Sequence, residues 1–109
     1  MNIGVDIVQM SRIKNKDTLA KGILCVEELE IYMDKGINQL SFLAGRFAAK
    51  EAFMKSIECG IDKTKFKDIK VLYKDSGAPY ISYKGETYEV SISHDGDYAI
   101  AIVNKKWKN

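Results

Sequence analysis

Apolar and small residues recur with helical spacing between residues 38 and 60. At 100° per residue, one arc of this segment gathers the large apolar side chains Leu40, Leu43, Phe47, Met54 and Ile57. The opposite side carries only alanine, glycine and serine. A helix without a broad charged face is usually buried, so the pattern predicts one interior helix of about 22 residues. Asn38 is expected to cap its start and Gly60 to end it.

Shorter patterns predict the remaining elements. Residues 2–8 predict a strand, residues 9–13 a short helical segment, and residues 26–35 a second helix with Glu28 as its capping-box acid. The second half of the chain predicts strands, at residues 66–73, 80–83, 86–93 and 98–103, with a loop at 93–97. Pro79 is expected to begin an edge strand. The last strand is apolar on both faces and is expected to be buried.

These elements favour a single domain over residues 1–109, of the α+β class, with a curved antiparallel sheet packed on one long helix. The chain has 109 residues, 46% hydrophobic and 29% charged, which suits one globular domain. It has no apolar run of the ~18 residues that a membrane span needs, and its start does not resemble a signal peptide. Its net charge of +2 is too small to predict nucleic-acid binding. We therefore expect a cytoplasmic protein without a membrane or nucleic-acid partner.

Two carboxylates occupy apolar surroundings. Glu51 falls inside the apolar arc of the long helix, and Asp6 interrupts the apolar strand at residues 4–8. A buried carboxylate needs a partner or a metal, and an oxygen-only pair suits Mg²⁺ rather than zinc. Two simpler alternatives stay open: an i,i+4 ion pair between Glu51 and Lys55, and an Asp6 that faces solvent at a sheet edge.

Cations and hydroxyl groups surround these positions in the sequence. Arg46 and Lys50 are spaced i,i+4 and could hold anionic oxygens, or could simply be solvated on the helix surface. Lys55 could orient or deprotonate an incoming hydroxyl. Ser91 and Ser93 could bind phosphate oxygens, or could simply face outwards from their strand. The only histidine, His94, could be catalytic, or could be solvated in its loop. Taken alone, these residues indicate a metal-assisted phosphoryl-type transfer.

Four segments together resemble one family. They are Gly4-Val5-Asp6-Ile7-Val8 with Ser11-Arg12-Ile13, the stretch Phe42-Leu43-Ala44-Gly45-Arg46-Phe47-Ala48-Ala49-Lys50-Glu51-Ala52-Phe53, then Gly77-Ala78-Pro79-Tyr80, and Val90-Ser91-Ile92-Ser93-His94-Asp95. In order and spacing they are similar to the bacterial holo-acyl-carrier-protein synthases, the small stand-alone 4'-phosphopantetheinyl transferases. The stretch around Arg46 is the most specific of the four.

The resemblance implies a reaction in which coenzyme A donates its phosphopantetheine arm to a serine of apo acyl carrier protein, with 3',5'-ADP leaving, for fatty acid biosynthesis. It implies Mg²⁺ held by Asp6 and Glu51, and Lys55 beside the reacting phosphate. It also implies coenzyme A contacts from a further set of residues, Arg46, Lys50, Gly77, Pro79, Ser91 and His94. Arg12 would face the acidic carrier protein, and the chain would form a homotrimer with sites at subunit boundaries. Lys55, Glu51 or a metal-bound water could take the serine proton.

The chain departs from the family pattern before its second helix. Gly22-Ile23-Leu24-Cys25 stands where the family commonly has Arg-Ile-Leu-Thr. Losing the threonine removes a helix cap worth about 1 kcal/mol, and losing the arginine removes a contact to the carrier protein. Three other functions remain as alternatives: a catalytically silent protein that binds coenzyme A or a carrier protein, a nucleic-acid-binding module, and a small Mg²⁺-dependent hydrolase.

Overall fold

The protein is described by a computed structural model that covers residues 3–57 and 65–105. Its first half contains a strand and the principal helices, β1 (Ile3–Gln9), α1 (Lys16–Ile23), α2 (Val26–Met33) and α3 (Gln39–Ser56). Its second half contributes the other strands, β2 (Lys70–Tyr73), β3 (Pro79–Tyr83), β4 (Glu86–Asp95) and β5 (Tyr98–Lys105). Short 3₁₀ segments lie at 10–12, 36–38 and 66–68.

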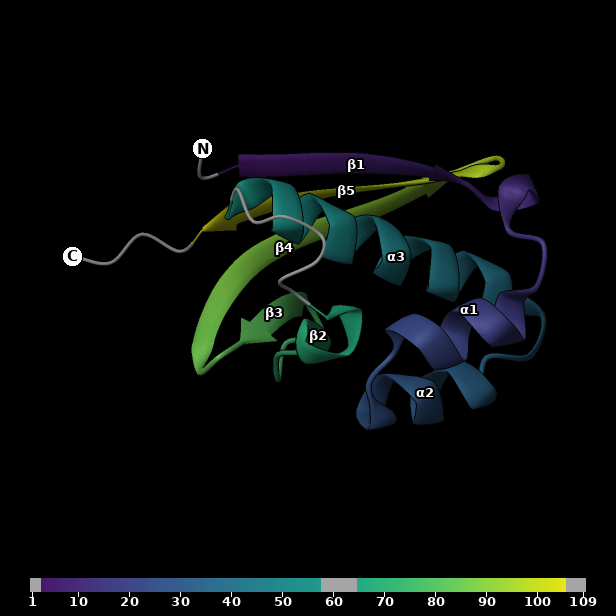
Figure 1. Ribbon diagram of the computed structural model, residues 1–109, viewed down its shortest axis with the longest axis horizontal. Coiled ribbons are helices and arrows are strands. Elements are labelled where there is room, and N and C mark those ends of the chain that lie inside the picture. Colours follow the sequence, from purple (N-terminus) through teal and green to yellow (C-terminus); the bar gives the residue numbers. More distant parts are fainter. Residues whose placement is uncertain (1–2, 58–64, 106–109) are drawn as a thin grey trace.

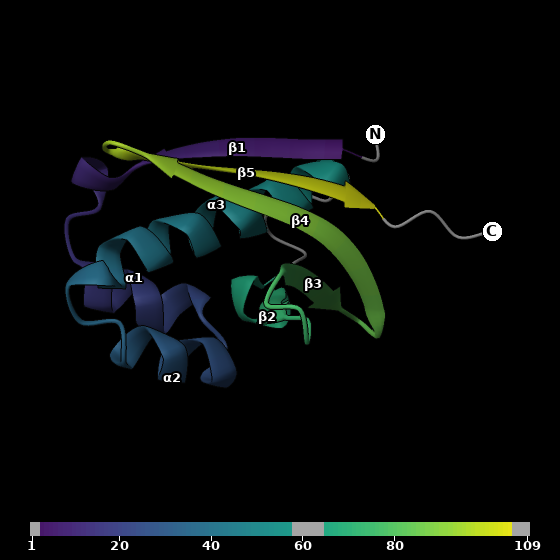
Figure 2. The ribbon, with the colours of Figure 1, turned by 180° about the vertical axis from the view of Figure 1, so that it is seen from behind.

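The strands form one antiparallel sheet in the order β1-β5-β4-β3-β2. The helix α3 lies along one face of this sheet, and α1 and α2 pack near its N-terminal half (Figure 1). From behind, β4 is a long bent strand that connects the β1–β5 part of the sheet to the small β2–β3 part (Figure 2). The α+β class and the curved sheet on one long helix are thus confirmed.

Small residues bring α3 close to the sheet. Ala44, Ala48 and Ala52 of α3 are fully buried among residues of the sheet. A second apolar cluster joins α1, α2 and α3 through six buried residues, Ala20, Ile23, Leu24, Tyr32, Phe42 and Leu43. Because α3 belongs to both clusters, its side chains can face either the sheet or the smaller helices. Within the described residues, none of the helices has the length and apolar character of a membrane span.

Several predicted elements differ from the structure. The sequence pattern missed α1, whose start is capped by Asn15, since its side chain accepts a hydrogen bond from the Thr18 N–H at 3.1 Å. Asn38 does precede α3, but its side chain makes no capping hydrogen bond, because a 3₁₀ segment leads into the helix instead. The predicted helix end at Gly60 lies outside the described residues.

The predicted strand at 66–73 is shorter, because residues 66–68 form a 3₁₀ turn before β2. Pro79 begins β3 as expected, but β3 is an internal strand that lies between β2 and β4. The predicted 93–97 loop is smaller, because β4 continues to Asp95 and pairs with Tyr98 of β5. His94 therefore projects from a strand.

The expectation that β5 is buried on both faces is wrong for the single chain. Ala99, Ala101 and Val103 face α3 and are at most 1% exposed. The alternate residues Tyr98, Ile100 and Ile102 are 43–48% exposed, because α3 covers only one face of the sheet (Figure 1).

Candidate active site: a carboxylate pair and a cationic pocket

The carboxyl groups of Asp6 and Glu51 lie together between β1 and α3. Burial raises the pKa of Glu51 above its usual value, and the negative charge of Asp6 and a hydrogen bond between the two side chains raise it further. The nearby Lys55 opposes this shift. Two adjacent carboxylates in a half-buried position repel each other when both are ionised. A cation between them would remove this cost.

Lys55 completes the carboxylate pair from the next turn of α3. Its Nζ donates to Asp6 Oδ1 at 2.9 Å and to the Val5 carbonyl oxygen at 3.0 Å. The Asp6 side chain is only 14% exposed, so the alternative in which Asp6 faces solvent is wrong. Glu51 is half-buried rather than fully buried. The Lys55 side chain is 57% exposed, which leaves its ammonium accessible to a ligand.

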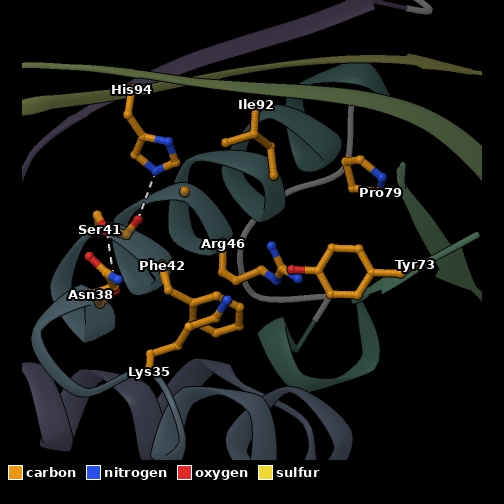
Figure 3. A pocket seen from close by; sticks show the side chains of 10 residues that line it. Lys35, Asn38, Ser41, Phe42, Arg46, Tyr73, Pro79, Ile92 and His94 are labelled. Atoms are coloured by element: carbon orange, nitrogen blue, oxygen red, sulfur yellow. Dashed lines mark hydrogen bonds between the residues drawn. The ribbon is translucent and has the colours of Figure 1, made fainter. Parts of the chain in front are cut away.

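A second feature is a pocket of about 330 Å³ on a different side of α3. Figure 3 shows it bounded by α3, β4 and the β2–β3 region. Its lining combines aromatic rings, three basic side chains and small polar groups, contributed by Lys35, Asn38, Ser41, Phe42, Gly45, Arg46, Tyr73, Pro79, Ile92 and His94. No carboxylate is among these residues. The pocket therefore favours an anionic ligand with a flat or apolar part.

Arg46 is the cation in the wall of this pocket. It is only 4% exposed, and its guanidinium carbon lies 4.4 Å from the centre of the Phe42 ring and 5.0 Å from that of Tyr73 (Figure 3). Within the described part of the chain, its buried Nε and Nη2 have no hydrogen-bond partner. Buried donors without a partner are costly, and an anion in the pocket could accept from them.

Lys35 adds an ammonium group and His94 an imidazole ring to the same pocket. The His94 Nε2–H donates to the Ser41 carbonyl oxygen at 2.8 Å. A Cβ on Gly45 would lie only 3.0 Å from Ile92 and 3.1 Å from the His94 ring, so a glycine suits this position. The Lys35 Nζ lies 5.4 Å from the centre of the Phe42 ring. Sequence reasoning missed Lys35, because nothing in the sequence distinguished it from the other lysines of the chain.

Lys50 does not reach the pocket. It is fully buried, and its Nζ donates to Glu28 Oε1 at 2.6 Å, to the Ile23 carbonyl oxygen at 2.6 Å and to the Phe66 carbonyl oxygen at 3.1 Å. Burial lowers the pKa of Lys50, and Glu28 opposes that shift. All three N–H groups are used inside the protein. The expected direct contact between Lys50 and coenzyme A is therefore not supported, and neither is a solvated Lys50.

Of the other residues predicted to bind coenzyme A, Pro79 lies at the pocket, whereas Gly77 and Ser91 do not. Pro79 lines the pocket, but Gly77 lies in the β2–β3 turn, where its φ of +91° suits glycine. Ser91 is exposed on the outer face of the sheet beside Ile3 and Ile102, because alternate residues of β4 face opposite sides. Neither Gly77 nor Ser91 belongs to the pocket lining in the described chain.

Arg12 ends the 3₁₀ segment that follows β1 and is exposed. The preceding residue, Ser11, is tied to Asp97 of the β4–β5 turn, with its N–H donating to Oδ1 at 3.0 Å and its hydroxyl donating to Oδ2 at 2.5 Å. The contact between Ser11 and Asp97 ties the 3₁₀ segment that contains Arg12 to the β4–β5 turn, and Arg12 itself is exposed.

The two halves of the predicted site lie on different sides of α3. Glu51 and Lys55 follow Arg46 by five and nine residues, which places them roughly 140° and 180° around the helix axis from it. One chain therefore presents the carboxylate pair on its β1 side and the cationic pocket on its β4 side.

Comparison with known proteins identifies the family of this chain. A model of the 4'-phosphopantetheinyl transferase superfamily matches residues 2–103. A holo-[acyl-carrier-protein] synthase from Oceanobacillus iheyensis is 38% identical, with 93% of this chain and 92% of that protein covered. A holo-[acyl-carrier-protein] synthase from a Geobacillus species is 43% identical, with 94% and 93% covered.

Comparison with solved structures indicates the same family. A crystal structure of a Bacillus anthracis holo-(acyl-carrier-protein) synthase in complex with CoA (3',5'-ADP) superposes with a TM-score of 0.84 at 38% identity, and covers 94% of this chain and 92% of that chain. The Neisseria meningitidis holo-[acyl-carrier-protein] synthase gives a TM-score of 0.85 at 31% identity, with 97% and 98% covered. The chain therefore belongs to the 4'-phosphopantetheinyl transferase superfamily, among its holo-[acyl-carrier-protein] synthases.

Proposed function

We propose that this protein transfers the 4'-phosphopantetheine arm of coenzyme A to a serine hydroxyl of an apo acyl carrier protein and releases 3',5'-ADP. The proposal depends chiefly on one observation: Asp6 of β1 converges with Glu51 and Lys55 of α3. The same helix presents Arg46 to a pocket suited to an anion. Family membership supports the reaction class, and coenzyme A is bound by the related Bacillus anthracis and Helicobacter pylori enzymes.

The carboxylate pair fits a magnesium ion. Its donors are oxygen atoms only, as Mg²⁺ prefers, and the pKa of Glu51 is raised first by burial and then by the neighbouring charge of Asp6. In the part of the chain that the structure describes, His, Cys, Asp and Glu side chains form no cluster of three or more that could hold a metal. A site with two protein ligands suits Mg²⁺, which usually retains water and substrate oxygens. When bound, the ion would neutralise charge on the diphosphate.

The residues of this chain then have distinct roles. The seryl oxygen forms a bond to the phosphorus that carries the pantetheine arm, the bond from that phosphorus to the bridging oxygen breaks, and 3',5'-ADP leaves with the bonding electron pair. The Lys55 ammonium is paired with Asp6, so we assign it to charge stabilisation beside the phosphate rather than to proton removal. The seryl proton passes to Glu51 or to a water molecule beside the carboxylate pair, which are the two acceptors that this assignment of Lys55 leaves.

The pocket is proposed to hold the nucleotide part of coenzyme A. The unpaired donors of Arg46, with Lys35 and His94, would face its phosphate oxygens. Arg guanidinium groups between aromatic rings are suited to binding phosphate. Lys50 is given no direct contact in this proposal, because its three donors are used internally.

We propose that the active form is a homotrimer with sites between subunits. The carboxylate pair and the pocket lie on different sides of α3, so a second copy of the chain could bring its carboxylate pair to this pocket, which supports the proposal. The outer face of β1 and β5 also carries exposed apolar side chains, at Ile3, Val5, Ile7, Ile100 and Ile102, each 43–60% exposed. An exposed patch of this kind is typical of an interaction surface.

The acidic acyl carrier protein would approach Arg12 from outside the pocket. Arg12 is exposed and ends the 3₁₀ segment that directly follows β1, the strand that carries Asp6. Because its substrates are coenzyme A and a carrier protein, we place the reaction in the cytoplasm. A physiological role in fatty acid biosynthesis is part of the same proposal.

Mass spectrometry of the carrier protein tests the proposal. The wild-type protein, coenzyme A and Mg²⁺ should add one phosphopantetheine to apo acyl carrier protein, and Glu51→Gln should abolish the addition. Glu27→Gln, which neutralises an exposed carboxylate of α2 paired with Lys70, is the matched control and should stay active. Cleavage of coenzyme A without modification of the carrier would indicate a hydrolase, and coenzyme binding without cleavage would indicate a catalytically silent protein. Either result would overturn the proposal.

A further inference from the structure

The most completely buried carboxylate in the described chain is Glu28, which the mechanism above does not use. It lies in the first turn of α2 and is 0% exposed. Its Oε1 accepts from the Cys25 N–H at 3.1 Å and from Lys50 Nζ at 2.6 Å, and its Oε2 accepts from the Val71 N–H at 3.3 Å. One side chain thus joins α2, α3 and β2. A helix cap alone would require only the first of these contacts.

The same carboxylate lies behind the pocket arginine. Arg46 Nε is 3.6 Å from Glu28 Oε2, an ion pair that is too long to be a good hydrogen bond. Glu28 also fixes β2 at Val71, two residues before Tyr73, whose ring stacks on the Arg46 guanidinium. Glu28 therefore acts on Arg46 both by its charge and by holding one of the two rings that enclose it.

The charges of this cluster do not balance. Glu28 carries one negative charge, whereas Lys50 and Arg46 carry one positive charge each, and all three side chains are at least 95% buried. Lys50 spends its three donors on Glu28 and on two carbonyl groups. The excess positive charge is therefore left on Arg46, whose Nε and Nη2 are without partners in the described structure. This is the arrangement of a cation held for an external anion.

We propose that Glu28 is a positioning residue for coenzyme A, which it serves by holding Arg46 and the Tyr73 strand in the geometry that accepts a phosphate group, while Lys50 neutralises its charge. The inference rests on the proposed function of the pocket. It explains why a lysine and a glutamate are buried together within a few ångströms of an arginine that is itself without a full partner. It also assigns to Lys50 an indirect role in place of the expected contact with the coenzyme.

A variant pair with unchanged net charge separates positioning from electrostatic attraction. Glu28→Gln with Lys50→Gln removes one charge of each sign, so the cluster keeps one net positive charge, on Arg46. The amide groups can still accept and donate hydrogen bonds, and replacing a buried ion pair by neutral groups is often tolerated. Glu27→Gln is the matched control, since it removes an exposed carboxylate from the adjacent position of α2.

The measurement is the KM for coenzyme A and the kcat of transfer at saturating apo carrier protein, with folding checked by circular dichroism. The double variant should raise KM about tenfold and change kcat less than about twofold, and Glu27→Gln should change neither. In an Arg46→Gln background the double variant should add almost nothing, because its effect acts through Arg46. A general folding defect would add its full effect in both backgrounds.

A second variant covers the case in which the double variant does not fold. Glu28→Asp keeps the charge but withdraws the carboxylate by one methylene, and it should also raise KM for coenzyme A. An unchanged KM in whichever of these variants folds would overturn the positioning role. If Arg46→Gln also left KM unchanged, the assignment of the pocket to coenzyme A would fail as well. Failure of the proposed function itself would be seen separately, as no transfer by the wild-type protein.

Discussion

Gly4 of β1 lies directly against Ala52 of α3. A Cβ atom built on Gly4 would lie 1.8 Å from the Ala52 carbonyl oxygen and 2.8 Å from the Ser56 backbone nitrogen. These neighbours are backbone atoms of a helix, so they cannot move aside independently. Asp6 follows two residues later on the same face of β1, and Glu51 precedes Ala52. The close approach at Gly4 thus brings the two carboxylates together.

Gly4→Ala should therefore destabilise the fold and impair the active site. We expect a loss of about 1–3 kcal/mol or more in the free energy of unfolding, as for other overpacked sites, measured by urea denaturation. Transfer activity should fall as β1 shifts Asp6 away from Glu51. The control is Gly22→Ala, because a Cβ at Gly22 has no neighbour within 4 Å and Gly22 lies in α1. That change should be neutral or stabilising by up to about 1 kcal/mol. Wild-type stability of Gly4→Ala would contradict this account of the contact.

Glu51→Gln should raise thermal stability while it abolishes transfer. The raised pKa of Glu51 means that folding disfavours its ionised form. The corresponding stability is present below the usual carboxyl pKa and is lost as pH rises through the folded value, so at pH 7 the cost is present. Removing the charge should raise Tm by a few degrees in EDTA, since about 1 kcal/mol corresponds to roughly 4–8 °C in a domain of this size. Glu27→Gln should not raise Tm, because a backbone hydrogen bond and then the hydrogen bond from Lys70 lower the pKa of Glu27. A fall in Tm for Glu51→Gln would contradict the repulsion argument.

Ile100→Asp should dissociate the proposed trimer. Ile100 is 43% exposed and pairs with Ile7, which is 60% exposed, on the outer face of the sheet. A charge placed there would be buried without a partner in an assembly, which is strongly unfavourable. Light scattering should report three copies for the wild-type protein and one for the variant, with loss of transfer. Val26→Asp, which alters a 71% exposed aliphatic residue on α2, should remain trimeric.

Shared sites can be tested by mixing inactive variants. Arg46→Gln should be weak and Glu51→Gln inactive when each is alone, but mixed trimers should recover part of the activity, because one interface can unite an intact pocket with an intact carboxylate pair. No recovery after subunit exchange would count against sites between subunits.

The contact between α1 and α2 should weaken at alkaline pH. Tyr32 is 1% exposed and its hydroxyl donates to Asp17 Oδ1 at 2.6 Å. Burial, with this hydrogen bond, raises the pKa of Tyr32 to about 12. Stability from this group is complete below the unfolded pKa near 10 and is lost as pH rises from about 10 to about 12. Denaturation curves of the wild-type protein should shift more over that interval than those of Tyr32→Phe. Equal shifts would show that Tyr32 does not contribute.

The sequence pattern was sufficient to predict α3, because apolar and small residues occupy nearly all sides of this segment and leave no broad charged face. The pattern could not predict that Arg46 and Lys50 lie in different surroundings. Both fall near the same arc, yet Lys50 is enclosed by Glu28 and Arg46 reaches a pocket. Which distant segment covers a given arc is a property of the tertiary structure, and periodicity carries no information about it.

Other differences have local causes. The helix α1 has eight residues and includes Gly22, so its apolar pattern is too short to stand out. The strand β5 is apolar on both faces, which the sequence pattern equates with burial, but the described chain covers only one of them. The importance of Glu28 was visible only as a helix-capping acid, since its contact with Val71 spans 43 residues.

The central claim is that Asp6 and Glu51 form one divalent-cation site. Mn²⁺, which can replace Mg²⁺ at oxygen sites and is visible by electron paramagnetic resonance, tests it directly in the presence of coenzyme A. The wild-type protein should bind one tightly held ion per chain, Asp6→Asn and Glu51→Gln should lose it, and Glu27→Gln should retain it. Wild-type stoichiometry and affinity in Glu51→Gln would contradict the claim.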